Sequence, residues 1–250
     1  MRKKKKMKKI LDYILSVVYV VWFGLILVIF HGIQVFAYNV LGQKAHQKTV
    51  EWMNFLIVYG WYLTGSSVTF HENPKLTLGT SKIFIANHQS MFDIPGIIWF
   101  LRKQTPLFIS KKELSKGIPS ISYNLRAGKA ALIDRNDPKQ AIAEIIRFAN
   151  YVKEKKFSAV IFPEGTRSRT GKLKPFAVGG VATLIKKIPD AEIVPIVIKN
   201  TGKFNPTGIF PLRSFVSMSW TTLAPIDSKG KTAEEITKEA EIAIKAFLGQ

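Results

Sequence analysis

A histidine and an aspartate five residues apart, His88 and Asp93 in the segment NHQSMFD, are the side chains of this chain best suited to proton transfer. Histidine titrates near neutral pH, so it can take a proton from a hydroxyl group. A carboxylate bound to one imidazole nitrogen fixes the tautomer and leaves the other nitrogen free to act as a base. Taken alone the pair is weak evidence, because a capping aspartate beside a turn histidine has the same spacing.

The segment Phe162–Gly180, FPEGTRSRTGKLKPFAVGG, has the composition of an anion-binding loop. It follows an apolar run and sets one carboxylate, Glu164, among several cations. These cations are Arg167, Arg169, Lys172 and Lys174. Free backbone N–H groups and arginine forks both suit a phosphate. A solvated basic loop is the alternative interpretation.

A third strand end carries Arg135, which follows the apolar pair Leu132–Ile133. The carboxyl ends of neighbouring strands share an edge of an α/β sheet, so we expect Arg135 to lie near the Phe162–Gly180 segment. Three predicted strand ends would then carry the pair His88 and Asp93, Arg135, and the Phe162–Gly180 segment. Their convergence is stronger evidence for a functional site than any one of them. The phosphate-binding candidates are therefore Arg135, Glu164, Gly165, Thr166 and Arg167.

Several kinds of chemistry are excluded by the sequence. The chain has no cysteine, so it has no thiol nucleophile, no disulfide and no cysteine-based metal site. Its four histidines form no HExxH or HxH pair, so we expect no metal. A G-x-S-x-G segment is also absent, so the nucleophile is expected to be the substrate's own hydroxyl.

Short apolar runs predict the strands that position these residues. The expected buried strands are Lys82–Ala86, Pro106–Ile109, Lys129–Ile133, Ser158–Phe162 and Glu192–Ile198. The alternating segment Phe215–Thr222 predicts a strand with one more exposed face. His88 therefore lies just past the carboxyl end of a strand, where open α/β sheets place active sites.

Helical periodicity separates these strands. An apolar stripe predicts a helix over Pro138–Lys153, capped by Asn136 or Asp137, and a second stripe predicts a helix over Thr232–Leu248. Strands alternating with helices predict an α/β fold with a mixed central sheet flanked by helices. We expect the catalytic domain to occupy residues 66–250, after an N-terminal region of residues 1–65.

The N-terminal region is typical of a membrane anchor. The 21 residues of Ile10–Phe30 carry a single charge, Asp12. As a helix this segment measures about 31 Å, roughly the thickness of the hydrocarbon layer of a bilayer. A cleaved signal peptide is less consistent with that length, and a buried core helix is the third alternative.

A second apolar segment, Val50–Leu63, has a helical stripe rich in aromatic residues. The stripe consists of Trp52, Phe55, Leu56, Tyr59 and Leu63. The segment is short for a membrane span, and a core-packing helix fits the same periodicity. We expect a membrane-embedded helical hairpin that dips into one leaflet and returns, although spanning by the first helix stays open. The rest of the chain would then lie on the cytoplasmic face of the cell membrane.

The net charge of +20 limits the partners, and seven of the cations lie in residues 1–9, which leaves +13 elsewhere. Strong basicity is typical of proteins that bind nucleic acid, anionic membranes or anionic substrates. The apolar N-terminus and the absence of a basic-aromatic recognition motif argue against nucleic acid. We expect anionic membrane lipids as partners, and a non-catalytic lipid-binding or nucleic-acid-binding protein remains the rival hypothesis.

Four blocks in order over Ser81–Asn200 resemble the 1-acyl-sn-glycerol-3-phosphate acyltransferases, also called lysophosphatidic acid acyltransferases. NHQSMFD matches the NHxxxxD block of that family. The other matching blocks are Gly128–Arg135, Phe162–Gly171 and Val194–Ile198. The segment Ser110–Leu114 also resembles a family segment with a functional lysine, here Lys111.

The resemblance implies a role for each candidate. His88 would deprotonate the sn-2 hydroxyl of lysophosphatidic acid, and Asp93 would orient His88. Acyl-CoA or acyl-carrier protein would donate the acyl group, with no cofactor. Lys111 would contact the oxyanion or the phosphate. The acceptor phosphate would be held by Arg135, Glu164, Gly165, Thr166 and Arg167.

One departure from the family pattern is visible. Many members carry basic residues after the Pro-Phe of the third block, whereas Ala177 and Val178 follow Phe176 here. No phosphate role is therefore carried over to those two positions. Acyl-chain length, the choice of donor and the oligomeric state stay open.

Overall fold

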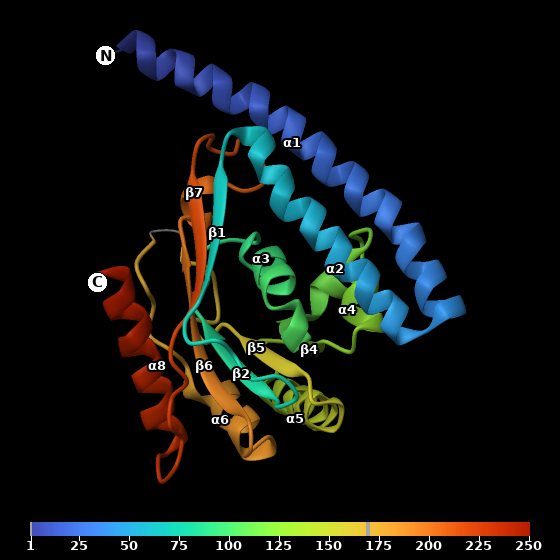
Figure 1. Cartoon of the computed structure of the whole chain (residues 1–250), viewed down its shortest axis with the longest axis vertical. Coiled ribbons are helices and arrows are strands. Elements are labelled where there is room, and N and C mark those ends of the chain that lie inside the picture. The colour runs from blue at the N-terminus through green and yellow to red at the C-terminus, as the bar shows by residue number, and fades with distance from the viewer. Residues whose placement is uncertain (1, 169–170) are drawn as a thin grey trace.

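Seven strands form one mixed sheet at the centre of the molecule (Figure 1). The computed structural model describes residues 2–168 and 171–250, so Arg169 lies outside the described residues. The strand order is β1-β7-β6-β2-β5-β3-β4, in which β6 and β7 are antiparallel and the other neighbours are parallel. The strands are β1 (Ser67–Glu72), β2 (Lys82–Ala86), β3 (Pro106–Lys111), β4 (Ala131–Ile133), β5 (Ser158–Ile161), β6 (Glu192–Lys199) and β7 (Ser217–Thr222).

This topology creates one edge at which five strands end. We call it the carboxyl edge, and it is the edge of the sheet at which β2, β3, β4, β5 and β6 terminate. Because β7 runs antiparallel to β6, its first residue lies at the same edge. The loops that follow β2, β4 and β5 therefore meet there, as the sequence predicts.

Both faces of the central strands are buried. On β2, Phe84 and Ala86 join one apolar core, while Ile83 and Ile85 join a second core on the opposite face. Side chains alternate across a strand, so a continuous apolar run is what a strand covered on both faces requires. Full burial of a side chain such as Phe84 contributes about 1.5–3 kcal/mol to the free energy of folding.

Helices cover the two faces in separate groups (Figure 1). The apolar stripes of α5, α6 and α8 pack on the face that holds Ile83 and Ile85, and the first three α-helices pack on the other. The helices are α1 (Arg2–Phe36), α2 (Gln43–Gly60), α3 (Asp93–Phe100), α4 (Ile121–Ala127), α5 (Pro138–Lys155), α6 (Val178–Lys187), α7 (Thr201–Phe204) and α8 (Ala233–Leu248). Shorter helical turns are η1 (Ala37–Leu41), η2 (Trp61–Thr64), η3 (Arg102–Gln104) and η4 (Lys112–Ser115).

The predicted helix starts agree with the structure. Asp137 caps α5 by accepting a hydrogen bond from the Gln140 N–H at 3.0 Å, and Pro138 occupies the first turn. Thr232 and Glu235 form a capping box at the start of α8. Each start is encoded by three or four adjacent residues, which is why the sequence alone predicts it.

Strand boundaries were predicted less well. The segment Lys129–Ile133 narrows to Ala131–Ile133, because Lys129 adopts a left-handed backbone conformation with φ of 62°. Phe215 also has positive φ, so β7 starts at Ser217 rather than at Phe215. The sequence analysis missed β1, which is half-exposed and gains its place by pairing with β7.

An aromatic centre joins the N-terminal helices to the sheet. The Trp61 ring stacks on Trp220 of β7 with 5.6 Å between ring centroids, and the Trp61 indole N–H donates to the Tyr19 hydroxyl at 2.7 Å. A Cβ at Gly96 of α3 would lie 2.2 Å from the Trp220 ring, so only glycine allows this approach. Residues from both sides of the predicted domain boundary, between residues 65 and 66, thus share one core. That domain boundary stays a prediction.

The two N-terminal helices form the expected hairpin, in which α1 and α2 run antiparallel beside each other (Figure 1). Both helices have a buried face, which for α2 includes Met53 and Ile57. In the predicted aromatic stripe, Trp52, Tyr59 and Leu63 are exposed, with Trp52 at 56%, whereas Phe55 and Leu56 are half-buried. The segment Lys6–Leu41 is long and apolar enough to cross a membrane, and 28% of its most apolar window is buried in the protein.

Candidate active site

His88 and Asp93 lie together at the carboxyl edge. His88 follows β2, and Asp93 opens α3, so the turn between the two elements brings their side chains into contact. The His88 Nδ1 atom lies 2.8 Å from Asp93 Oδ2. Since the carboxylate accepts a hydrogen bond from Nδ1, the Nε2 lone pair is left available as a base. The predicted histidine and aspartate are therefore brought together.

Asp93 is fully buried and held from several directions. Its Oδ2 atom also accepts hydrogen bonds from the N–H groups of Gln89 at 2.7 Å and Ser90 at 2.9 Å. Its Oδ1 atom accepts from the Thr201 hydroxyl, at the start of α7. The Trp220 indole N–H donates to the Asp93 carbonyl oxygen at 3.1 Å. These contacts fix the carboxylate, and the sequence analysis identified neither Thr201 nor Trp220.

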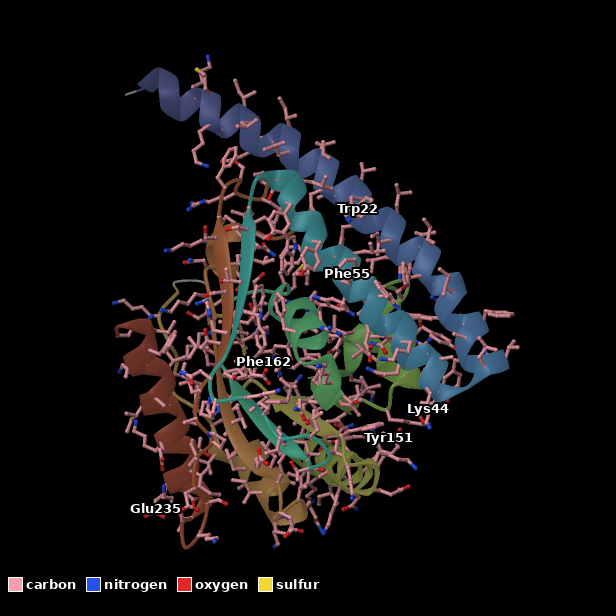
Figure 2. All side chains as sticks on the ribbon, in the orientation of Figure 1. Trp22, Lys44, Phe55, Tyr151, Phe162 and Glu235 are labelled. Atoms are coloured by element: carbon pink, nitrogen blue, oxygen red, sulfur yellow. The ribbon has the colours of Figure 1, made fainter. Side chains whose placement is uncertain are left out.

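The His88 ring is fixed on its flat side by Phe162, the residue that follows β5. Ring centroids lie 4.2 Å apart with an interplanar angle of 21°. Figure 2 shows Phe162 in the middle of the molecule, among the strands. The His88 side chain is only 13% exposed, so the stacked ring is largely shielded from water. Such shielding strengthens the electrostatic interactions of the imidazole.

Glu164 ties the His88 turn to the loop after β5. One carboxylate oxygen accepts from the His88 N–H at 2.6 Å, and the other accepts from the Lys174 N–H at 3.1 Å. Burial raises the pKa of Glu164 above its usual value, and the two N–H donors oppose that change. A second tie joins the Ser168 N–H to the His88 carbonyl oxygen at 2.7 Å. Both oxygens of Glu164 thus face backbone donors of the protein itself.

We expect Glu164→Ala to lower the stability of the protein. Two partly buried N–H groups would lose their acceptor, at a cost of up to about 1–3 kcal/mol each. The pKa of Glu164 is higher in the folded protein than its unfolded value, which is near 4.5. Its contribution to stability is therefore fully present below pH 4.5 and is lost as pH rises through the folded pKa. Wild-type should therefore gain stability relative to the variant as pH falls toward 4.5. Chemical denaturation across pH measures this difference, and Glu154→Ala, an exposed change on α5, is the control.

The loop after Glu164 exposes the predicted phosphate ligands. Gly165 has φ of 69°, which only glycine adopts without strain, and the turn leaves Thr166 and Arg167 at the surface. The Lys174 ammonium group donates to the Thr166 hydroxyl at 2.7 Å and to the Arg167 carbonyl oxygen at 3.0 Å. Lys174 thereby braces the loop, a role that the sequence analysis did not assign to it.

Arg135 lies close enough to Arg167 for the two charges to interact. Partial burial lowers the pKa of Arg135, the negative charge of Glu113 opposes this effect, and the positive charge of Arg167 adds to it by a smaller amount. Two cations that repel each other across a surface are a favourable site for an anion, because a phosphate between them relieves the repulsion. The loops after β4 and β5 thus place the two predicted arginines within range of each other's charge.

Lys111 occupies the last position of β3 at the carboxyl edge and is exposed. It is paired in register with Ile133, two residues before Arg135. Lys111 thus lies at the carboxyl edge, on the strand next to the one that leads to Arg135. Across residues 2–168 and 171–250, no three His, Cys, Asp or Glu side chains are grouped as metal ligands.

Comparisons with known proteins agree with the resemblance seen in the motifs. A family model described as Acyltransferase matches residues 67–199. A 1-acyl-sn-glycerol-3-phosphate acyltransferase of Cocos nucifera is 39% identical over 56% of this chain and 44% of that protein. One of Limnanthes douglasii is 31% identical over 72% of this chain and 64% of that protein. The chain thus spans less than two thirds of the length of both curated relatives.

The fold is also found in a solved structure. A crystal structure of the 1-acyl-sn-glycerophosphate (LPA) acyltransferase PlsC from Thermotoga maritima matches with a TM-score of 0.80. The match covers 97% of this chain and 96% of that protein, at 24% sequence identity. The predicted fold class, a mixed sheet flanked by helices and preceded by a helical hairpin, is therefore confirmed, and embedding of the hairpin in a membrane stays a prediction.

Proposed function

This chain belongs to the Acyltransferase family, whose model matches residues 67–199, and we propose that it acylates the sn-2 hydroxyl of 1-acyl-glycerol-3-phosphate. The acyl group comes from an acyl thioester, and the product is phosphatidic acid. The observation that carries this proposal is the shared edge of the sheet. His88 and Asp93 lie 2.8 Å apart there, beside a loop whose Arg167 interacts with Arg135.

In the proposed reaction, His88 acts as the general base. Its Nε2 atom takes the proton of the sn-2 hydroxyl while the oxygen attacks the thioester carbonyl carbon. The buried Asp93 carboxylate stabilises the imidazolium that forms. The tetrahedral intermediate then collapses, the carbon–sulfur bond breaks, and the thiolate takes the proton from His88. Lys111 or backbone N–H groups donate hydrogen bonds to the oxyanion.

The acceptor phosphate binds at the carboxyl edge between the loops. Arg135 and Arg167 supply positive charge, and Gly165 and Thr166 supply an N–H group and a hydroxyl. Glu164 serves this site as a positioning residue, since its two oxygens already accept backbone hydrogen bonds at 2.6 and 3.1 Å. Fixing the phosphate sets the hydroxyl near Nε2, and such positioning supplies several kcal/mol of the barrier reduction.

The exposed apolar faces of α1 and α2 are the basis for a membrane location. On α1 these residues include Val21, Leu25 and Val28, each more than half exposed. A continuous apolar surface with this many exposed side chains is rare on a soluble protein and marks an interaction surface. We propose that it lies in one leaflet of the cell membrane at the cytoplasmic face. The lipid acceptor then reaches the site from the same leaflet, and the donor, acyl-CoA or acyl-carrier protein, arrives from the cytoplasm without any cofactor.

An acyl-transfer assay tests the proposed function. Purified protein in vesicles should convert lysophosphatidic acid and radiolabelled acyl-CoA to labelled phosphatidic acid, and a parallel reaction with acyl-carrier protein identifies the donor. Glycerol 3-phosphate and lysophosphatidylcholine serve as alternative acceptors. Binding of lysophosphatidic acid without turnover by either donor would support the rival, non-catalytic hypothesis instead.

We expect Arg167→Ala to raise the KM for lysophosphatidic acid by about 10- to 150-fold with a smaller change in kcat. Hydrogen bonds to a charged group contribute about 1.5–3 kcal/mol, which corresponds to that range. Lys153→Ala, which removes an exposed cation from α5, should leave KM unchanged. An unaltered acceptor KM in Arg167→Ala would remove Arg167 from the phosphate site.

A further inference from the structure

The loop of residues 205–216, which joins α7 to β7, exposes apolar side chains at the carboxyl edge. Ile209, Phe210 and Phe215 are 39%, 42% and 61% exposed. The loop begins four residues after Thr201, whose hydroxyl holds Asp93, and it returns to the first residue of β7. It therefore lies at the carboxyl edge, next to the N-terminal half of α1, rather than at the hairpin turn.

This loop is fixed in place by hydrogen bonds. The Arg213 N–H donates to the Phe204 carbonyl oxygen at 2.9 Å and closes the base of the loop. The Leu212 N–H donates to the Ser16 hydroxyl at 2.8 Å, and the Ser214 N–H donates to Asp12 Oδ1 at 2.9 Å. The apolar side chains are thus presented to the outside by a loop that is bound to α1.

The exposed apolar residues of the loop continue those of α1. The Phe210 ring packs edge-to-face against Tyr13, with 5.4 Å between centroids. Tyr13 is itself 41% exposed and belongs to the exposed face of α1. One apolar strip therefore runs from the outer face of α1 onto the loop.

Positive charge borders this strip. The segment Lys199–Val216 contains Lys203 and Arg213, both exposed, and no aspartate or glutamate. The first turns of α1 add Lys6, Lys8 and Lys9, and the Lys8 ammonium lies 6.0 Å from the Phe215 ring centroid. Apolar side chains bordered by cations are typical of a segment that lies at the headgroup boundary of an anionic bilayer.

We propose that the 205–216 loop is a second lipid contact, which inserts Ile209, Phe210 and Phe215 into the headgroup boundary of an anionic bilayer. This inference rests on the proposed function, because it assumes that the acceptor is a membrane lipid. The hairpin holds the protein on the membrane, and the loop sets the carboxyl edge against the lipid surface. A lysophosphatidic acid molecule then reaches His88 without leaving the headgroup layer.

A single introduced cysteine reports insertion directly, because the chain has no cysteine of its own. Ile209→Cys carries an environment-sensitive fluorophore, Val21→Cys reports the hairpin, and Leu78→Cys is the control. Leu78 is 65% exposed and lies between β1 and β2, at the edge opposite the active site. With vesicles of phosphatidylglycerol and phosphatidylcholine, the labels at 209 and 21 should shift to the blue while the label at 78 does not.

The result separates the possible failures. A shift at 21 without a shift at 209 overturns the loop contact and leaves membrane association by the hairpin intact. No shift at either position overturns both. A shift at 209 that requires acyl-carrier protein and not vesicles also overturns the lipid contact, because the cationic loop would then bind an acidic protein.

An activity measurement gives the second test. The double variant Ile209→Ser/Phe210→Ser should stay on vesicles through the hairpin and lose about tenfold in turnover of vesicle-borne lysophosphatidic acid. With detergent-dispersed acceptor, the turnover of the double variant should equal that of wild-type. A defect in the catalytic groups would instead lower turnover with both forms of the acceptor. Phe247→Ser, on the exposed side of α8, is the matched control. Equal losses with both forms of the acceptor would overturn the proposal.

Discussion

Replacing His88 with alanine is expected to lower the turnover of lysophosphatidic acid by about 10²- to 10⁴-fold, the usual contribution of a general base. The other three histidines lie on other elements, His31 on α1, His46 on α2 and His71 on β1. The variant should keep its fold and its membrane binding, since the His88 backbone N–H still donates to Glu164. Single-turnover acyl transfer at saturating acceptor measures the chemical step directly.

The control for this experiment is His71→Ala. His71 lies on β1 and is exposed, so its loss should leave turnover unchanged. Exogenous imidazole is a further readout, because it can enter the space left by the ring and restore part of the rate. Full turnover in His88→Ala would rule out His88 as the base.

Asp93→Asn is expected to lower turnover by about 10²- to 10⁴-fold while the protein stays folded. The Asp93 Oδ2 atom faces three N–H donors, those of His88 Nδ1, Gln89 and Ser90, so the asparagine carbonyl oxygen should take that position. Its NH₂ group then faces the Thr201 hydroxyl, which can turn to accept. The geometry survives, and the negative charge that stabilises the imidazolium is lost.

Two measurements separate this loss of charge from a loss of structure. The melting temperature and vesicle binding of Asp93→Asn should match those of wild-type, whereas kcat falls and the acceptor KM changes little. Asp190→Asn, at an exposed turn before β6, is the control and should change neither. A variant with wild-type kcat would show that His88 needs no charged partner.

The sequence predicted which side chains would lie together where the information is local. His88 and Asp93 lie on one turn, and the strand ends that carry Arg135 and Arg167 follow clear apolar runs. Thr201 was missed because its contact with Asp93 joins positions 108 residues apart, and no local pattern marks it. Glu164 was predicted as a phosphate ligand, while its contacts with the protein depend on how two loops pack.

The fold shows the same division between local and distant information. The buried strands β2, β5 and β6 were predicted because burial on both faces leaves continuous apolar runs. The half-exposed β1 has no such run, and only its pairing with β7, from Ser67 opposite Ser217, makes it a strand. For α1, hydropathy averaged along the sequence combines the apolar residues of the buried face with those of the exposed face. The average therefore cannot distinguish a helix that spans a membrane from one that packs on the protein.

The stacking of Trp61 on Trp220 has a consequence for the order in which this protein is made. The ribosome adds about 5–20 residues per second, so the hairpin exists for roughly 8–30 s before β7 is synthesised. During this time Trp61 lacks Trp220 of β7, and Tyr19 lacks Phe92 and Phe204, the rings that later cover them. We expect the nascent hairpin to bury both of its apolar faces in lipid or in a chaperone and to turn one of them toward the sheet only when synthesis is nearly complete. Membrane insertion would then precede folding of the catalytic sheet.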